Sequence, residues 1–227
     1  MNRKEFLRIT ASLGLASVLA PSALAQEPGP TPAEALKLLK EGNARYVSAL
    51  KTNGTGRGAD RRAEVVKDQR PHAIILSCSD SRVAPEVFFD SGIGELFVVR
   101  VAGNIVSGSN YGIIGTCEYG AAVLQSPLLV VLGHENCGAV KAAIDTIDRK
   151  TTLPGSIEDI VEAIRPAAEA SKGRPGDALH NAMEENVRHG MKRLPSMSTV
   201  LDERLRSGKL MMVGGIYDLT SGQVKFL

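Results

Sequence analysis

The fold is decided by residues 73–82, which read AIILSCSDSR. An apolar run of four residues, typical of a buried strand, passes directly into a polar loop. A second stretch of the same form, residues 128–137, reads LLVVLGHENC. In parallel α/β sheets, functional sites are built where the strands end at the carboxyl edge. The two stretches therefore predict a parallel sheet with one polar site at that edge.

Three side chains of these loops are expected to form a metal site. Cys78 follows the first strand, and His134 and Cys137 follow the second. Zinc binds cysteine and histidine readily, and a site with three protein ligands leaves the fourth position to water, as in catalytic zinc sites. The prediction is one zinc ion per chain. The alternative is a buried thiol pair or a disulfide, which explains neither the histidine nor the placement at strand ends.

Two charged residues of the first loop, Asp80 and Arg82, are the candidate catalytic pair. The simpler interpretation is a salt bridge that only holds the loop. In the functional interpretation, Arg82 keeps Asp80 ionised, and Asp80 accepts a hydrogen bond from the group in the fourth zinc position. Zinc lowers the pKa of bound water to about 7, so hydroxide is available at neutral pH to attack a small electrophilic carbon.

Strands and helices alternate along the rest of the chain. The predicted fold class is α/β, with a mainly parallel central sheet flanked by helices and a C-terminal strand hairpin at its edge. Cys117 lies in an apolar helical segment, where it is expected to be a buried core residue. Further strands are expected at 94–100, 210–217 and 224–227, and helices at 33–50, 60–68, 110–125, from 138 onward, 156–171 and 176–205.

The first 25 residues have the three regions of an export signal: a charged start, a short apolar stretch and Ala23-Leu24-Ala25. They resemble a twin-arginine signal with Lys4 in the second arginine position, so the Tat-like and Sec routes both stay open. The alternative is an uncleaved N-terminal helix. We expect a linker over 26–32, a single catalytic domain over 33–227, and a mature protein in the periplasm or outside the cell.

The charge composition argues against a polyanionic partner. The whole chain has 27 basic and 25 acidic side chains, and without residues 1–25 the two kinds are equal in number. No cluster of lysine and arginine stands out beyond short pairs such as Arg61-Arg62. We therefore expect no nucleic acid partner, and no membrane association of the mature form.

Several motifs together resemble the β-class carbonic anhydrases, from about residue 33 to the C-terminus. They are CSDSRV at 78–83, HENCG at 134–138, GNARY at 42–46, FVVRVAGN at 97–104 and Glu118-Tyr119. The resemblance implies reversible hydration of carbon dioxide to bicarbonate and a proton. It also implies an obligate dimer, or a dimer of dimers, with active sites near the dimer interface.

The resemblance assigns roles residue by residue. Cys78, His134 and Cys137 match the zinc ligands, and Asp80 and Arg82 match the catalytic dyad. Five further residues match the substrate pocket: Gln69, Phe97, Ala102, Tyr119 and Gly138. Gln69 matches a glutamine that often reaches across the dimer interface, and Ala102 stands where some members have a larger residue.

The resemblance also bears on whether the enzyme is gated. In the pH-gated branch Asp80 would be a fourth zinc ligand in a closed state, and that branch tends to have tryptophan three residues before the first cysteine ligand. Here that residue is Ile75, which favours the open branch. A hydrolase for CS₂ or COS and a non-catalytic zinc protein are the rival functions. The second would not need Asp80, Arg82 and Gln69.

Overall fold

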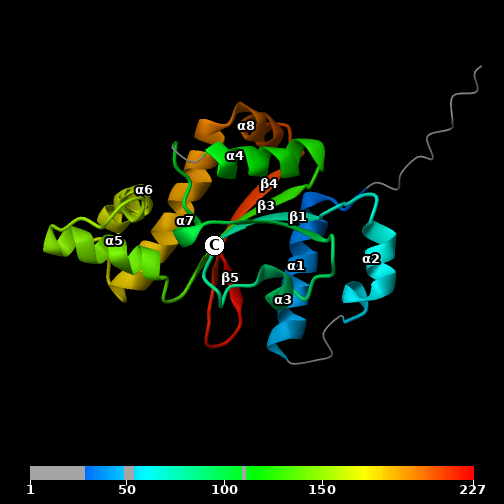
Figure 1. Cartoon of the computed structure of the whole chain (residues 1–227), viewed down its shortest axis with the longest axis horizontal. Helices are drawn as coiled ribbons and strands as arrows, with labels where there is room; N and C mark the ends of the chain where they lie inside the picture. The colour runs from blue at the N-terminus through cyan, green and yellow to red at the C-terminus, as the bar shows by residue number, and fades with distance from the viewer. Residues whose placement is uncertain (1–28, 49–53, 109–110) are drawn as a thin grey trace, which may run out of the picture.

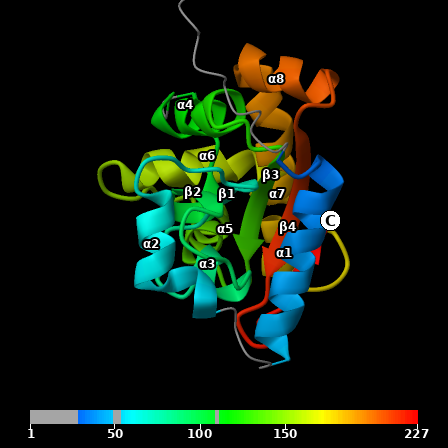
Figure 2. The same ribbon diagram turned by 90° about the vertical axis from the view of Figure 1, so that its right-hand side faces the viewer.

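The computed structural model describes residues 29–48, 54–108 and 111–227. Its centre is a five-stranded sheet in the order β2-β1-β3-β4-β5, shown in Figures 1 and 2. The first four strands are parallel and β5 is antiparallel to β4. The strands are β1 (Ala73–Ser77), β2 (Leu96–Arg100), β3 (Leu128–His134), β4 (Met211–Tyr217) and β5 (Val224–Phe226).

Helices connect the strands and cover both faces of the sheet. In the described residues, none of them is long and apolar enough to span a bilayer. The α-helices are α1 (Pro32–Val47), α2 (Ala59–Val65), α3 (Pro85–Phe88), α4 (Tyr111–Glu118), α5 (Gly138–Arg149), α6 (Ile157–Ala170), α7 (Ala178–Met197) and α8 (Thr199–Arg206). Shorter turns are the 3-10 helices η1 (Gly54–Arg57) and η2 (Ala102–Asn104) and the π-helix η3 (Tyr119–Val123).

Alternate residues of each central strand enter two separate cores, because successive side chains of a strand point to opposite faces. Ile74 and Leu76 belong to the core that α4–α8 cover. Ile75 belongs to the smaller core on the other face, which α1 and α3 cover. All residues of β1 and β3 are buried, which explains why these strands read as continuous apolar runs. The expected fold class, including the hairpin at the sheet edge, is confirmed.

The first helix begins as its sequence predicts. Thr31 caps α1 by accepting from the Glu34 N–H, and the Glu34 carboxylate accepts from the Thr31 N–H in return. The helix continues through Asn43 because that buried amide has partners outside the helix. Asn43 donates to the backbone oxygens of Phe88 and Gly222 and accepts from the Val224 N–H. It thereby joins α1 to both α3 and the C-terminal hairpin.

Two expected helices differ from the structure. The segment 176–205 forms two helices, since Ser198 ends α7 and caps α8 by accepting from the Leu201 N–H at 3.0 Å. The segment 110–125 is α-helical only to Glu118 and then widens into the π-helix η3. In both cases the hydrophobic periodicity continues across the change, so the pattern alone predicts one helix.

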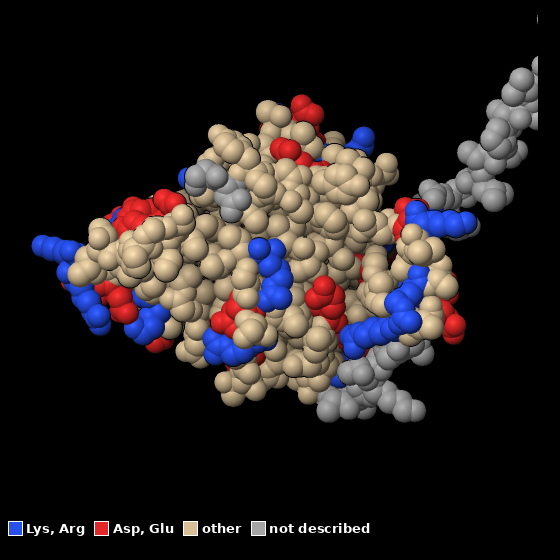
Figure 3. All heavy atoms as spheres, in the orientation of Figure 1, with Lys and Arg blue, Asp and Glu red and all other residues tan. Residues whose placement is uncertain are grey.

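Charged side chains on the face in Figure 3 gather near α5 and α6 at one end, near α2 at the other, and in a smaller group at and below the middle. Both signs occur at each end, and most of the area between carries neither. No field of a single sign extends across this face. The polar residues that the sequence singles out lie instead at the carboxyl ends of β1 and β3. There the chain leaves β1 for β2 on one side of the sheet and later returns to β3 on the other, which makes a topological switch point.

Candidate metal centre and active site

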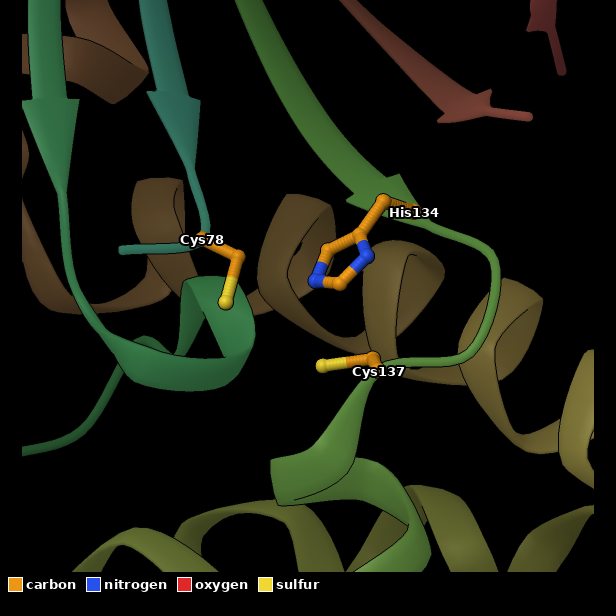
Figure 4. A group of neighbouring side chains, drawn as sticks. All are labelled: Cys78, His134 and Cys137. Carbon is orange, nitrogen blue, oxygen red and sulfur yellow. The ribbon is translucent and has the colours of Figure 1, made fainter. Parts of the chain in front are cut away.

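Cys78, His134 and Cys137 converge at the switch point, as Figure 4 shows. Cys78 directly follows β1, His134 is the last residue of β3, and Cys137 is the N-cap of α5. One ligand atom from each lies within 4.8 Å of the other two, and all three residues are buried. The two strand-end loops therefore deliver two sulfurs and one imidazole to a single point.

The orientation of the His134 ring suits a metal ligand. Its Nδ1 lies 2.9 Å from the backbone oxygen of Glu135. A carbonyl oxygen only accepts, so Nδ1 carries the proton and Nε2 keeps its lone pair. Nε2 is buried and has no hydrogen-bond partner. An unpaired buried nitrogen beside two thiols fits a soft cation such as zinc, which this donor set would hold with one position left over.

The two thiols of the trio affect each other's ionisation. A hydrogen bond from Cys137 lowers the pKa of the Cys78 thiol well below its usual range, and the same bond raises the pKa of Cys137. Cys78 Sγ also accepts from the backbone N–H groups of Gly103 at 3.2 Å and Asp80 at 3.4 Å. In contrast, burial raises the pKa of Cys117 to about 12. All three cysteines are free, so the disulfide that the sequence left open as an alternative is not formed.

Asp80 lies beside the trio and is paired with Arg82. Arg82 Nε donates to Asp80 Oδ1 at 3.0 Å and Nη2 donates to Oδ2 at 2.8 Å. These bonds hold the pKa of the Asp80 carboxyl well below its usual range. Asp80 Oδ2 is also 3.9 Å from His134 Nε2. The carboxylate thus faces the candidate metal position, and the guanidinium of Arg82 stabilises its negative charge.

Arg100 is a site residue whose role the sequence did not reveal. It ends β2, and its guanidinium donates to the backbone oxygens of Cys78 at 3.1 Å and Asp80 at 2.6 Å. It therefore fixes the course of the loop that carries the ligand and the carboxylate. In the sequence, Arg100 stood out only by its place at the end of a strand, next to residues 102–104. The register of β1 and β2, which the sequence does not show, brings it to this loop.

Helix α7 supplies two further contacts that sequence reasoning missed. His180 Nδ1 lies 2.7 Å from Glu135 Oε1. The buried amide of Asn186 donates to the Gly103 backbone oxygen at 2.8 Å. Both partners belong to strand-end loops, yet α7 lies more than 40 residues from one and more than 80 from the other along the chain. No local pattern relates such distant positions.

The five expected substrate residues fall into two groups. Ala102 and Gly138 lie at the metal centre, next to Gly103 and Cys137 respectively. The other three lie toward the opposite, amino edge of the sheet. Gln69 precedes β1 and shares a hollow with Tyr119, and the Tyr119 ring centroid is 6.0 Å from that of Phe97. One chain therefore does not bring all of its expected substrate residues to its own metal centre.

Comparisons with known proteins agree with this geometry. A family model described as carbonic anhydrase matches residues 73–224. A carbonic anhydrase of Mycolicibacterium smegmatis is 37% identical, over 87% of this chain and 94% of its own length. Carbonic anhydrase 2 of Mycobacterium tuberculosis is also 37% identical, over 86% and 93%.

Solved structures point to the same class. The β-carbonic anhydrase CcaA superposes with a TM-score of 0.65 at 30% identity, over 86% of this chain and 92% of that one. The Coccomyxa β-carbonic anhydrase, solved in complex with acetazolamide, gives 0.65 at 27% identity, over 85% and 86%. With the fold and the family model in agreement, the chain belongs to the carbonic anhydrase family, in its β class.

Proposed function

We propose that this protein catalyses the zinc-dependent, reversible hydration of carbon dioxide to bicarbonate and a proton. Hydration of carbon dioxide is the general reaction of the family. The observation that carries the zinc-dependent form is the convergence of Cys78, His134 and Cys137, with the unpaired His134 Nε2 facing the two sulfurs. One zinc ion per chain fits this donor set.

Zinc held there would lower the pKa of a coordinated water to about 7 and so supply a nucleophile at neutral pH. The protein's own groups orient the reaction. Asp80 is ionised and can only accept, so it would accept a hydrogen bond from a hydroxyl group in the fourth position and leave a lone pair of that group free to face the substrate carbon. Arg82 keeps that carboxylate in place through two parallel hydrogen bonds. Arg100 holds the loop that carries Asp80 and Arg82 through its hydrogen bonds to the backbone oxygens of Cys78 and Asp80.

The test is a stopped-flow pH-indicator assay of carbon dioxide hydration, with zinc measured on the same sample. Wild-type protein should contain about one zinc per chain, as a single three-ligand site requires. Cys78→Ser should lose the metal and at least about 100-fold in activity, because the metal supplies the nucleophile. Cys117→Ala is the matched control, since it removes a buried thiol outside the trio and should keep both.

Activity without zinc, or zinc without hydration activity, would each contradict the proposal. Hydrolysis of COS and CS₂ should be measured on the same preparations. A rate with either substrate that exceeds the rate with carbon dioxide would favour the rival hydrolase.

We further propose that the active form is a homodimer or a dimer of dimers. Gln69, Phe97 and Tyr119 can serve a metal centre only if it belongs to another subunit. Around them the surface is unusually apolar: Val66 is 76% exposed, Val123 59% and Tyr119 47%. A second copy that covers this region would bury those side chains and bring the three residues to its own metal centre.

We also propose that residues 1–25 are an export signal and that the mature protein is periplasmic or secreted. These residues lie outside the described part of the structure, as do the first three residues of the expected 26–32 linker. The support is the sequence of a charged start, an apolar stretch and Ala23-Leu24-Ala25. Mass spectrometry of native protein should give an N-terminus near Gln26 in the periplasmic or extracellular fraction. Intact Met1 on the bulk of cytosolic protein would contradict this.

A further inference from the structure

The loop after β2 touches the metal centre through one peptide group. In this loop, η2, the Gly103 N–H donates to Cys78 Sγ at 3.2 Å. Gly103 has a φ of 68°, in the left-handed region that favours glycine. A side chain there would meet Ile164 Cδ1 at 2.7 Å and Ala139 Cβ at 3.1 Å. Packing by α5 and α6 therefore leaves room only for glycine, but apolar contacts do not set the direction of its peptide groups.

Asn186 provides that direction from α7. Its Nδ2 donates to the Gly103 backbone oxygen at 2.8 Å, and its side chain lies in the interior with only 4% of the residue exposed. Met183 and Val187, on the same helix, are part of the apolar core that also contains Cys78 and Cys137. A buried amide in such surroundings costs free energy unless it is hydrogen-bonded, so breaking this bond is unfavourable and the amide holds the Gly103 carbonyl in one direction.

We propose that Asn186 is a positioning residue for the metal centre, acting through Gly103 on the Cys78 sulfur. By holding the carbonyl on one side of Gly103, it keeps the N–H on the other side aimed at Cys78 Sγ. A hydrogen bond to a ligating sulfur withdraws electron density from it and fixes its direction, which tunes how the ligand binds its metal. This inference rests on the proposed metal function of the trio.

The chain offers a close control on the same helix. Asn181 also donates from its side-chain amide to a backbone oxygen, that of Pro175 at 3.1 Å. Pro175 is not part of a strand-end loop that contacts the metal ligands. Asn186→Leu removes the donor at similar volume, and Asn186→Asp removes it while keeping an oxygen. Asn181→Leu and Asn181→Asp repeat both changes on the control.

The experiment uses full-length protein loaded with zinc or cobalt(II). The Asn186 variants should bind zinc about tenfold more weakly in a chelator competition, as expected for loss of a contact behind a ligand. Their cobalt(II) forms should show a shifted sulfur-to-metal charge-transfer band, because the Cys78 sulfur has lost its hydrogen bond. The Asn181 variants should match wild type in both measurements.

A measurement on unmutated protein covers the case in which the Asn186 variants do not fold. In protein loaded with cadmium-113, the Gly103 amide proton should show scalar coupling to the metal through the hydrogen bond to Cys78. Absence of that coupling would overturn the inference. So would folded Asn186 variants with wild-type zinc affinity and charge-transfer band, even if they melt at lower temperature. Wild-type protein that binds no zinc would instead overturn the proposed function.

Discussion

Among single residues, Arg82 has the most specific expected effect, because it is the partner that holds Asp80 away from a metal. In Arg82→Ala the carboxylate loses both side-chain hydrogen bonds while it stays 3.9 Å from His134 Nε2. It should then move onto the metal and exclude water, and carbon dioxide hydration should fall about tenfold or more. A crystal structure of the zinc-loaded variant should show Asp80 as the fourth ligand.

The same pair gives a pH-dependent stability. The pKa of Asp80 is lowered from an ordinary 3.8 by the Arg82 hydrogen bonds. The contribution of Asp80 to the free energy of unfolding is therefore fully present above about pH 4. It is lost as the pH falls toward the lower pKa that Asp80 has in the folded state. Wild type should exceed Arg82→Ala in free energy of unfolding at pH 7, by a small margin because the guanidinium is exposed. Urea titrations should show this difference shrink progressively as the pH falls below about 4.

The control for the activity measurement is Arg165→Ala. Arg165 pairs with Glu162 on the exposed side of α6, away from the metal ligands. This variant should keep activity. If Arg82→Ala kept full turnover with water on the metal, Arg82 would not be the group that holds Asp80 away from it. If wild-type protein at mildly acidic pH already carried Asp80 on the metal, the enzyme would belong to the gated branch and not to the open one.

Among the elements, the junction of α7 and α8 depends on one hydroxyl. Ser198 Oγ accepts from the Leu201 N–H at 3.0 Å and donates to Glu118 Oε1 at 2.5 Å, which ties α8 to the end of α4. Ser198→Ala should lower the free energy of unfolding by about 1–2 kcal/mol, since it removes a cap and leaves the carboxylate without this donor.

Ser196→Ala is the matched control for urea unfolding. Ser196 is exposed and donates only to the Arg193 backbone oxygen within its own helix. Its removal should change stability by less than about 0.5 kcal/mol. Equal effects of the two substitutions would show that Ser198 does not support the junction.

The sequence predicted the elements well where local chemistry determines them. The buried strands β1 and β3 were expected from apolar runs at 73–76 and 128–133, and α1 from the Thr31 capping box. The division of 176–205 was missed because the apolar periodicity continues past Ser198, and its cap is recognised only with the fold around it. The same limit applies to Arg100 and Asn186. Each contacts the site through backbone oxygens, which any residue type carries, so the amino-acid pattern holds no signal of the pairing.

At the scale of the whole molecule, the two edges of the sheet carry different parts of the expected active site. The metal centre lies at the carboxyl edge, and Gln69, Phe97 and Tyr119 lie toward the amino edge. In a twofold dimer each site would combine the carboxyl edge of one subunit with the amino edge of the other. The two kinds of residue would then belong to different polypeptides within every working site.

This separation has a genetic consequence: two inactive alleles should complement each other. Cys78→Ser and Gln69→Ala damage opposite edges, so a mixed dimer has one fully intact site and one doubly damaged site. With random pairing, co-expressed variants should reach about a quarter of wild-type activity, since half of the dimers are mixed and half of their sites are intact. Two variants of the same edge, Cys78→Ser and His134→Ala, should give none. If co-expressed Cys78→Ser and Gln69→Ala were no more active than either variant expressed alone, Gln69 would not belong to the active site of the partner subunit.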